Sequence, residues 1–254
     1  MLTVKKISIY MDELLSVPRI ADYSNNGLQV EASQSIKKIA FAVDTSLENF
    51  KKAADGGADL LVVHHGLFWG QALLITGYVA ERMRFLFENN LSLYAVHLPL
   101  DVHTELGNSV ALAEAAGFTT CNWFAPEKGV NLGCLAAHPE GLPYETVLTN
   151  LQRILGSRPT TVIPDSFKGK LIKKVGTVTG GGMRFGLEAA ELGADLYISG
   201  ESSHAWYHPI MECGIPTILY GHYLSETLGI KRLMEHMSKE KGCETFYIDT
   251  PTNM

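Results

Sequence analysis

The sequence predicts an α/β protein made of two duplicated lobes, and three observations support this prediction. Stretches typical of strands and of helices alternate along the chain, which indicates mostly parallel sheets with flanking helices. A segment of the first half recurs in the second half. Histidines and carboxylates follow the predicted strands at their carboxyl ends, where ligands gather in parallel sheets. We therefore expect lobes related by a pseudo-twofold axis, with a dinuclear metal site in the cleft between them.

The first half begins with an amphipathic segment. Thr3 can cap a helix whose apolar positions Ile7, Met11 and Leu14 recur at helical spacing, and Pro18 bounds it. The polar segment 22–30 is rich in turn residues, so we expect a loop. After it, the pattern predicts strands at Lys38–Val43, Leu60–Val63 and Leu91–Val96, and helices at Leu47–Asp55, Val79–Glu88 and Asn108–Ala116.

The second half continues the alternation. Strands are predicted at Asn131–Ala137, Thr160–Ile163, Ile172–Val178, Leu196–Ser199, Thr217–Tyr220 and Phe246–Ile248. Helices are predicted from Pro143 to about Leu155, and at Phe185–Leu192, Ala205–Cys213 and Leu224–Met237.

An internal repeat defines the two lobes. A shift of 136 positions places Ser35–Gly66 on Leu171–Ser202 without a gap, and GADL recurs at Gly57–Leu60 and Gly193–Leu196. With a changed offset, the segment ending at His97 matches the one ending at His222. We predict an N-terminal α/β lobe over residues 1–125 and a C-terminal α/β lobe over 126–254. No linker is rich in Pro, Gly or Ser, so the lobes are expected to pack together.

Composition excludes several classes of protein. Of the 254 residues, 46% are hydrophobic and 19% are charged, which is typical of a globular protein. There is no apolar run long enough for a signal peptide or a membrane span. The net charge of −6 gives no electrostatic footprint for nucleic acid. The four cysteines lie far apart without a CxxC pair, so we expect neither a zinc knuckle nor a disulfide framework. The absence of such a framework favours a reducing compartment, and we expect a cytoplasmic location.

Five residues at strand ends are candidate metal ligands: His64 and His65 after LLVV, Asp101 after LYAVHLPL, and His222 and Glu226 after ILYG. Imidazole together with carboxylate suits zinc, iron or manganese. Side chains alternate along a strand, so adjacent histidines suit two ions better than one. A carboxylate can bridge two ions about 3.5–4 Å apart. We predict two divalent metal ions per chain.

Each motif also has an ordinary structural interpretation. A histidine pair alone is usually structural, and HxxxD or HxxxE is often an ion pair on a helix face. His97 is a candidate for proton transfer, although a hydrogen-bonded structural histidine fits equally well. Glu201, His103 and His204 are candidates for support of the ligands, with helix capping as the alternative for Glu201. The GGGM run at 180–183 resembles a phosphate loop but lacks its lysine, and a tight turn fits at least as well.

The motifs NNGLQV, VVHHGLFW, HLPLDVHTELGN, SGE and GHYLSE, in this order, resemble those of the NGG-interacting-factor-three-like family, whose members are commonly named GTP cyclohydrolase 1 type 2 homologues. The resemblance extends from about Ile7 to about Tyr247. It implies duplicated α/β lobes, a dinuclear metal centre and a homohexameric ring. The resemblance also implies that His64 binds one ion together with His222, that His65 binds the other together with Asp101, and that Glu226 bridges the two ions.

Three functions remain open. The first is a metal-dependent hydrolase for a nucleotide-like or other small substrate, with GTP implied by the resemblance. The second is a phosphoesterase or another hydrolase with the same ion pair, and the third is a non-catalytic metal-binding or assembly protein. Nothing in the sequence identifies a guanine pocket.

Overall fold

Two compact units make up the chain. The structure, a computed structural model, describes residues 2–163 and 169–252. Contacts within the chain define unit 1 as the residues up to Leu100 with Ile230–Thr250, and unit 2 as Asp101–Gly229 with the residues from Pro251. This division is discontinuous in sequence, whereas the lobes expected from the repeat are continuous. Among the described residues, no helix combines the length and apolarity needed to cross a membrane.

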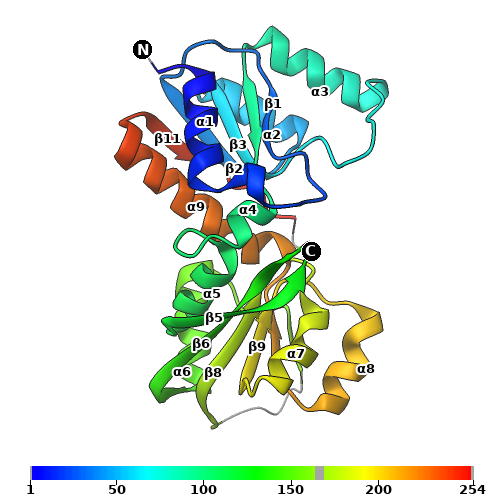
Figure 1. Ribbon diagram of the computed structural model, residues 1–254, viewed down its shortest axis with the longest axis vertical. Coiled ribbons are helices and arrows are strands. Elements are labelled where there is room, and N and C mark those ends of the chain that lie inside the picture. Colours follow the sequence, from blue (N-terminus) through cyan, green and yellow to red (C-terminus); the bar gives the residue numbers. More distant parts are fainter. Residues whose placement is uncertain (1, 164–168, 253–254) are drawn as a thin grey trace. The chain divides into compact units, whose positions relative to one another are not determined.

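Unit 1 contains a five-stranded sheet with the order β1-β4-β3-β2-β11. The three central strands and β11 are parallel, and β1 is antiparallel to β4 (Figure 1). Thr3 caps the first helix, as predicted, by accepting a hydrogen bond from the amide of Lys6. The elements are α1 (Val4–Leu14), η1 (Val17–Arg19), β1 (Gly27–Val30), β2 (Lys38–Asp44), α2 (Leu47–Asp55), β3 (Leu60–His65), α3 (Gly77–Glu88), β4 (Ser92–Ala95) and β11 (Glu244–Tyr247).

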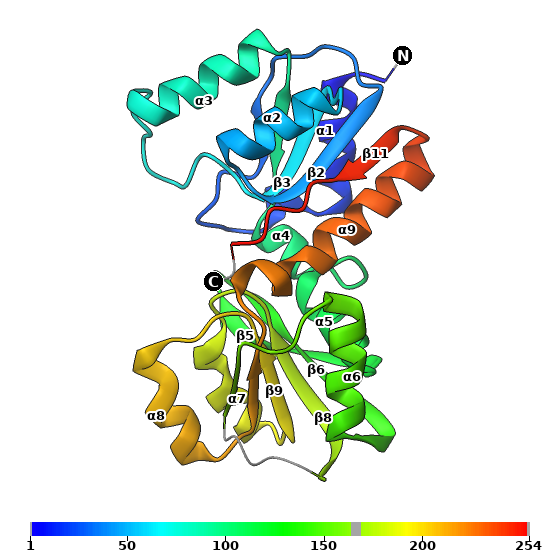
Figure 2. The same ribbon diagram turned by 180° about the vertical axis from the view of Figure 1, so that it is seen from behind.

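Unit 2 contains a six-stranded sheet with the order β5-β6-β8-β9-β10-β7. Its helices include α5 and α6 on one face and α7 and α8 on the other (Figure 2). The elements are α5 (Asn108–Ala116), β5 (Thr120–Glu127), β6 (Val130–Pro143), α6 (Tyr144–Leu155), β7 (Thr161–Ile163), β8 (Leu171–Val178), η2 (Met183–Phe185), α7 (Gly186–Glu191), β9 (Leu196–Ser199), α8 (His204–Cys213) and β10 (Thr217–Leu219). Helix α4 (Leu98–Asp101) follows β4, and α9 (His222–Lys241) follows β10; both contain residues of each unit.

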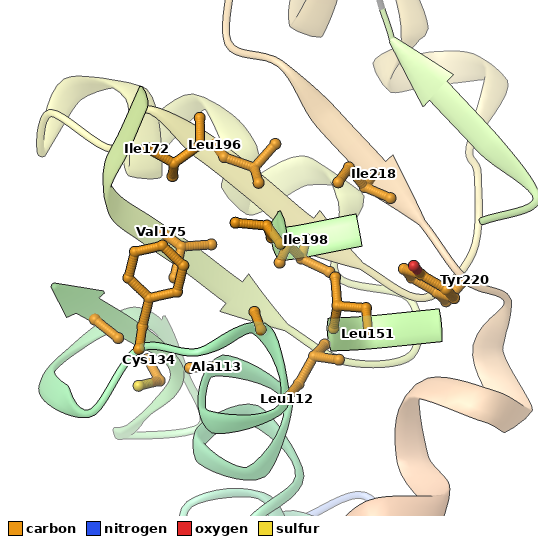
Figure 3. Close-up of a cluster of buried hydrophobic side chains, with 14 of the residues drawn as sticks. Leu112, Ala113, Cys134, Leu151, Ile172, Val175, Leu196, Ile198, Ile218 and Tyr220 are labelled. Atoms are coloured by element: carbon orange, nitrogen blue, oxygen red, sulfur yellow. The ribbon is translucent and has the colours of Figure 1, made fainter. Parts of the chain in front are cut away.

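The core of unit 2 explains why its strands are so apolar. On one face, Ile172, Leu196 and Ile198 of adjacent strands pack against Leu112 of α5 and Leu151 of α6 (Figure 3). The opposite face has its own buried cluster, which includes residues of α7 and α8. Strands covered on both faces require apolar residues at successive positions, which is the pattern of Leu196–Ser199.

The internal repeat has a counterpart in backbone hydrogen bonds. In unit 1, Asp59 Oδ2 accepts from the amides of Lys37 and Lys38, and in unit 2 Asp195 Oδ2 accepts from the amides of Lys173 and Lys174. The parallel strands also pair in the same order, β2-β3-β4 and β8-β9-β10. The matching sequences therefore adopt matching local structures. The pseudo-twofold axis stays a prediction.

Three features depart from the expected fold. The sheet of unit 2 is mixed, because β5, β6 and β7 pair antiparallel, so the expectation of a mostly parallel sheet holds for unit 1 alone. Strand β5 was not predicted because Pro126 interrupts its pattern; a tight turn with Lys128 and Gly129 at positive φ joins it to β6. Residues 27–30, expected as loop, form the short edge strand β1.

The cysteines also differ from expectation. Cys213 and Cys243 are free, but Cys134 is disulfide-bonded. Cys134 lies on β6, which pairs over a long stretch with β5. The spacing of the cysteines in the sequence does not reveal this bond.

Candidate metal centre

The end of β3 brings two imidazoles close together. His64 is fully buried and His65 is partly exposed, and their ring centroids lie 4.6 Å apart. His64 Nδ1 lies 2.9 Å from the carbonyl oxygen of Val96, and His65 Nδ1 lies 2.7 Å from Asp44 Oδ1. Each ring is thus held by a residue at the end of a neighbouring strand, β4 for His64 and β2 for His65.

His97, which follows β4, joins this pair. Its ring centroid lies 5.1 Å from that of His64 and 5.7 Å from that of His65. Each of the three histidines has a ring nitrogen within 4.8 Å of the others, a spacing that suits metal binding. Unit 1 therefore contains three histidines at the carboxyl ends of β3 and β4, which we call the histidine cluster.

Asp22 fixes the orientation of His97. Its side chain is only 2% exposed, and it accepts hydrogen bonds from His97 Nδ1, Asn26 Nδ2 and the amide of Leu98. Burial by itself would raise the pKa of this carboxyl, but the hydrogen bond and charge of His97, with hydrogen bonds from Asn26 and the amide of Ser24, outweigh burial and lower the pKa to about 2. The segment expected to be only a loop therefore anchors a candidate site residue.

In unit 2, His222 lies between two carboxylates. Its Nδ1 is 2.9 Å from Glu201 Oε2, and its Nε2 is 3.2 Å from Glu226 Oε2. Burial opposes the charged imidazolium, but Glu226 and Glu201 outweigh this effect and raise the pKa of His222 to about 9. Glu226 is almost fully buried at the start of α9. Glu201 is exposed, so the buried charge beside His222 is that of Glu226, and this charge favours a cation.

The glycine run after β8 makes room for these side chains. Gly180 has φ +57°, and a Cβ added there would meet the Glu226 carboxylate and His222 Nε2. The Gly180 amide donates to Ser225 Oγ, which donates to the carbonyl of His222. The GGG turn therefore packs against the start of α9. This contact accounts for Gly180 without a phosphate.

The remaining candidates lie in different surroundings. Asp101 is buried and accepts from Asn108 Nδ2, whose Oδ1 accepts from the amide of Gly229. His103 Nδ1 accepts from the amides of Glu105 and Leu106, and these two bonds stabilise the turn before α5. His204 is an exposed first residue of α8. Their roles as a ligand and as supports of the ligands stay predictions.

Two carboxylates were missed in the sequence. Asp44 is the last residue of β2, so the rule that identified His64 and His65 at a strand end also applies to it. Asp22 carries no such signal, because it lies in a loop and reaches His97 only through the tertiary fold.

A mixed α/β fold with histidines and carboxylates at strand ends defines a class of candidate metal-binding proteins. The family model Duf34/NIF3 (NGG1p interacting factor 3) matches residues 2–254. The chain belongs to this family.

Similar proteins agree with this assignment. The chain is 42% identical to a protein of Archaeoglobus fulgidus over 96% of this chain and 97% of that one, and 38% identical to one of Pyrococcus abyssi over 98% and 99%. Both relatives are named GTP cyclohydrolase 1 type 2 homolog. Among solved structures, the structural-genomics protein ybgI, described as of unknown function, superposes with a TM-score of 0.90 at 31% identity and full coverage of both chains. A protein of Thermus thermophilus superposes with a TM-score of 0.84 at 34% identity, also with full coverage.

Proposed function

We propose that the protein is a dinuclear metal-dependent hydrolase acting on a small, nucleotide-like substrate, with GTP as the first candidate. The proposal is supported above all by the hydrogen bonds of the histidine rings, which show which ring nitrogen carries the proton. His64, His65 and His97 each direct Nδ1 at a carbonyl or carboxylate oxygen. These oxygens only accept hydrogen bonds, so Nδ1 carries the proton and the lone pair of a neutral ring is on Nε2, the arrangement seen in metal-binding histidines. His222 differs, because both of its ring nitrogens face carboxylates and a cation would take the place of its Nε2 proton.

The proposed ligands are His64, His65, Asp101, His222 and Glu226. Their nitrogen and oxygen atoms suit zinc, iron or manganese better than calcium or magnesium. Bridging by Glu226 would offset the repulsion between two dications. Buried acidic oxygens beside His222 support a cation in unit 2, and the histidine cluster supports one in unit 1.

Bound ions would act as Lewis acids and activate water for hydrolysis. The side chains of the chain supply the other parts of the chemistry. His97 holds its proton at Nδ1 toward Asp22, so its Nε2 can accept a proton from water or substrate. Asp22 keeps that ring in one orientation. The names of the relatives support a nucleotide substrate.

Turnover and product identity test the proposal. Chelator-treated protein reloaded with zinc, iron or manganese is incubated with GTP, other nucleotides and phosphoesters. We expect ring opening of GTP or of a related heterocycle, and no turnover by His65→Ala prepared in parallel. Release of phosphate alone would indicate a phosphoesterase. Metal binding without turnover of any of these compounds would favour a metal-binding or assembly protein.

A further inference from the structure

A cavity in unit 1 begins beside the histidine cluster. It has a volume of about 300 Å³, the size of a small-ligand site. The strand ends and the loop after β3 line it with Asp44, His65 and Trp69, and helix α3 lines it with Tyr78 and Arg82. A molecule in this cavity would therefore contact His65 and α3 together.

Trp69 presents a fixed aromatic surface in this cavity. Its indole N–H donates to the carbonyl of Gly66 at 2.9 Å, and its ring centroid lies 5.1 Å from that of His97 and 6.0 Å from that of His65. These contacts hold the ring, yet 40% of the residue stays exposed. A large aromatic side chain that is held in place but exposed is suited to stack on a planar ligand.

Arg82 supplies a positive charge to the same cavity. Its guanidinium carbon lies 5.2 Å from the ring centroid of Tyr78, one helical turn earlier on α3, and Tyr78 is 67% exposed. Within the described part of the chain, no carboxylate forms an ion pair with Arg82. A guanidinium with its charge uncompensated and its plane supported by an aromatic ring is suited to bind phosphate or carboxylate.

We propose that this cavity binds a planar heteroaromatic compound that bears an anionic group, with the ring on Trp69 and the anion on Arg82. Asp44 gives the ligand a direction, because its carboxylate lies beside His65 and disfavours an anion there. The uncharged ring therefore faces His65, and the phosphate or carboxylate faces α3. The inference rests on the proposed function for its chemistry, and it assigns Trp69 and Arg82 as determinants of substrate specificity.

Binding to the full chain after chelation tests the proposal without any contribution from metal. Isothermal titration with GMP, guanosine and ribose 5-phosphate separates the ring from the phosphate. Arg82→Gln should weaken GMP binding by about 10-fold or more and leave guanosine unchanged. Trp69→Leu should weaken GMP and guanosine by about 5-fold or more and leave ribose 5-phosphate unchanged, while Trp69→Phe should retain most of the affinity.

The matched control is Arg84→Gln, an exposed arginine on α3 that does not line the cavity. Equal effects of Arg84→Gln and Arg82→Gln, an unchanged GMP affinity in Arg82→Gln, or no binding of any probe by folded wild type would overturn the proposal.

Different results would contradict the binding site and the proposed hydrolase activity. If ligand affinity depends on Trp69 and Arg82 as expected but metal-loaded protein shows no turnover, only the hydrolase proposal is contradicted. Turnover with an unchanged KM in both cavity variants contradicts only the binding site.

Discussion

Hydrogen bonds at single atoms decide what the histidines of this protein can do. A neutral imidazole whose Nδ1 donates to an oxygen has its lone pair on Nε2, and His64, His65 and His97 share this arrangement. His103 differs, because its Nδ1 accepts from two backbone amides and its lone pair is used within a turn. The hydrogen bonds at Nδ1 thus separate candidate ligands from a histidine that stabilises a loop, although all of them lie near the same sequence motifs.

Glu226 is the most informative single residue to change. Glu226→Gln keeps the size of a side chain that is 4% exposed but removes the charge beside His222. We expect at least one ion to be lost and turnover to disappear, since two unit charges about 4 Å apart already interact by roughly 4 kcal/mol at an effective dielectric constant near 20. In metal-free protein, the pKa of His222 should fall from about 9, which NMR titration would detect.

Glu235→Gln is the matched control for this change, because Glu235 is exposed on the same helix α9. It should leave metal content and the pKa of His222 unaltered. Retention of both ions and of full activity in Glu226→Gln would show that Glu226 does not bridge.

Asp22 gives a prediction for stability against pH. Its pKa is lowered from 3.8 to about 2 in the folded protein, so its stabilising effect is complete above the unfolded pKa and is lost as the pH falls from about 4 to about 2. Asp22→Asn should reduce the free energy of unfolding by about 2 kcal/mol near neutral pH, and the difference from wild type should vanish below about pH 2. Urea denaturation over this pH range measures it. The exposed Asp55→Asn serves as a control, and a pH-independent difference for Asp22→Asn would contradict the assigned cause.

At the scale of elements, turns at strand ends deliver the site residues. The turn after β8 is an example, because Gly180 combines a positive φ with close approach to His222 and Glu226. The histidines of β3 are oriented in a similar way. Asp44 at the end of β2 accepts a hydrogen bond from His65 Nδ1, and the carbonyl of Val96 after β4 accepts one from His64 Nδ1. The strands are thus arranged so that neighbouring strand ends orient the rings.

Gly180→Ala tests the turn after β8. Alanine at positive φ costs about 1–2 kcal/mol of stability, and here its Cβ also displaces the Glu226 carboxylate. Gly156→Ala isolates the first effect, since Gly156 has φ +71° and nothing within 4 Å of an added Cβ. Thermal unfolding should show a loss of stability in both variants that is larger in Gly180→Ala, and elemental analysis should show metal loss only in Gly180→Ala. Full metal content in Gly180→Ala would contradict the packing argument.

The sequence predicts most of the parallel strands and the histidines at their ends, because buried strands are continuous apolar runs followed by polar residues. The match of Leu60–Val63 with β3 and of Leu196–Ser199 with β9 illustrates this. The antiparallel β5 was missed because Pro126 weakens its local pattern, although a tight turn joins it to β6. Asp22 was missed for a different reason, since only the tertiary fold brings a loop carboxylate to His97.

At the scale of the whole molecule, resemblance to the family predicts a homohexamer. An amphipathic first helix and exposed apolar residues such as Leu74 and Tyr78 are compatible with an interface but do not require one. Light scattering at several protein concentrations should give the mass of a hexamer. A monomer at high concentration would contradict this expectation, and it would leave the metal proposal intact.

We expect the chain to bind two divalent ions through His64, His65, Asp101, His222 and Glu226. Elemental analysis of purified protein, before and after reloading with zinc, iron or manganese, counts these ions. We predict about two ions per chain. His65→Ala and Asp101→Ala should each lose mainly the same ion, and His236→Ala on α9, a histidine away from the strand ends, should retain both. Wild-type protein that is purified without metal and takes up none of the three metals would contradict this expectation.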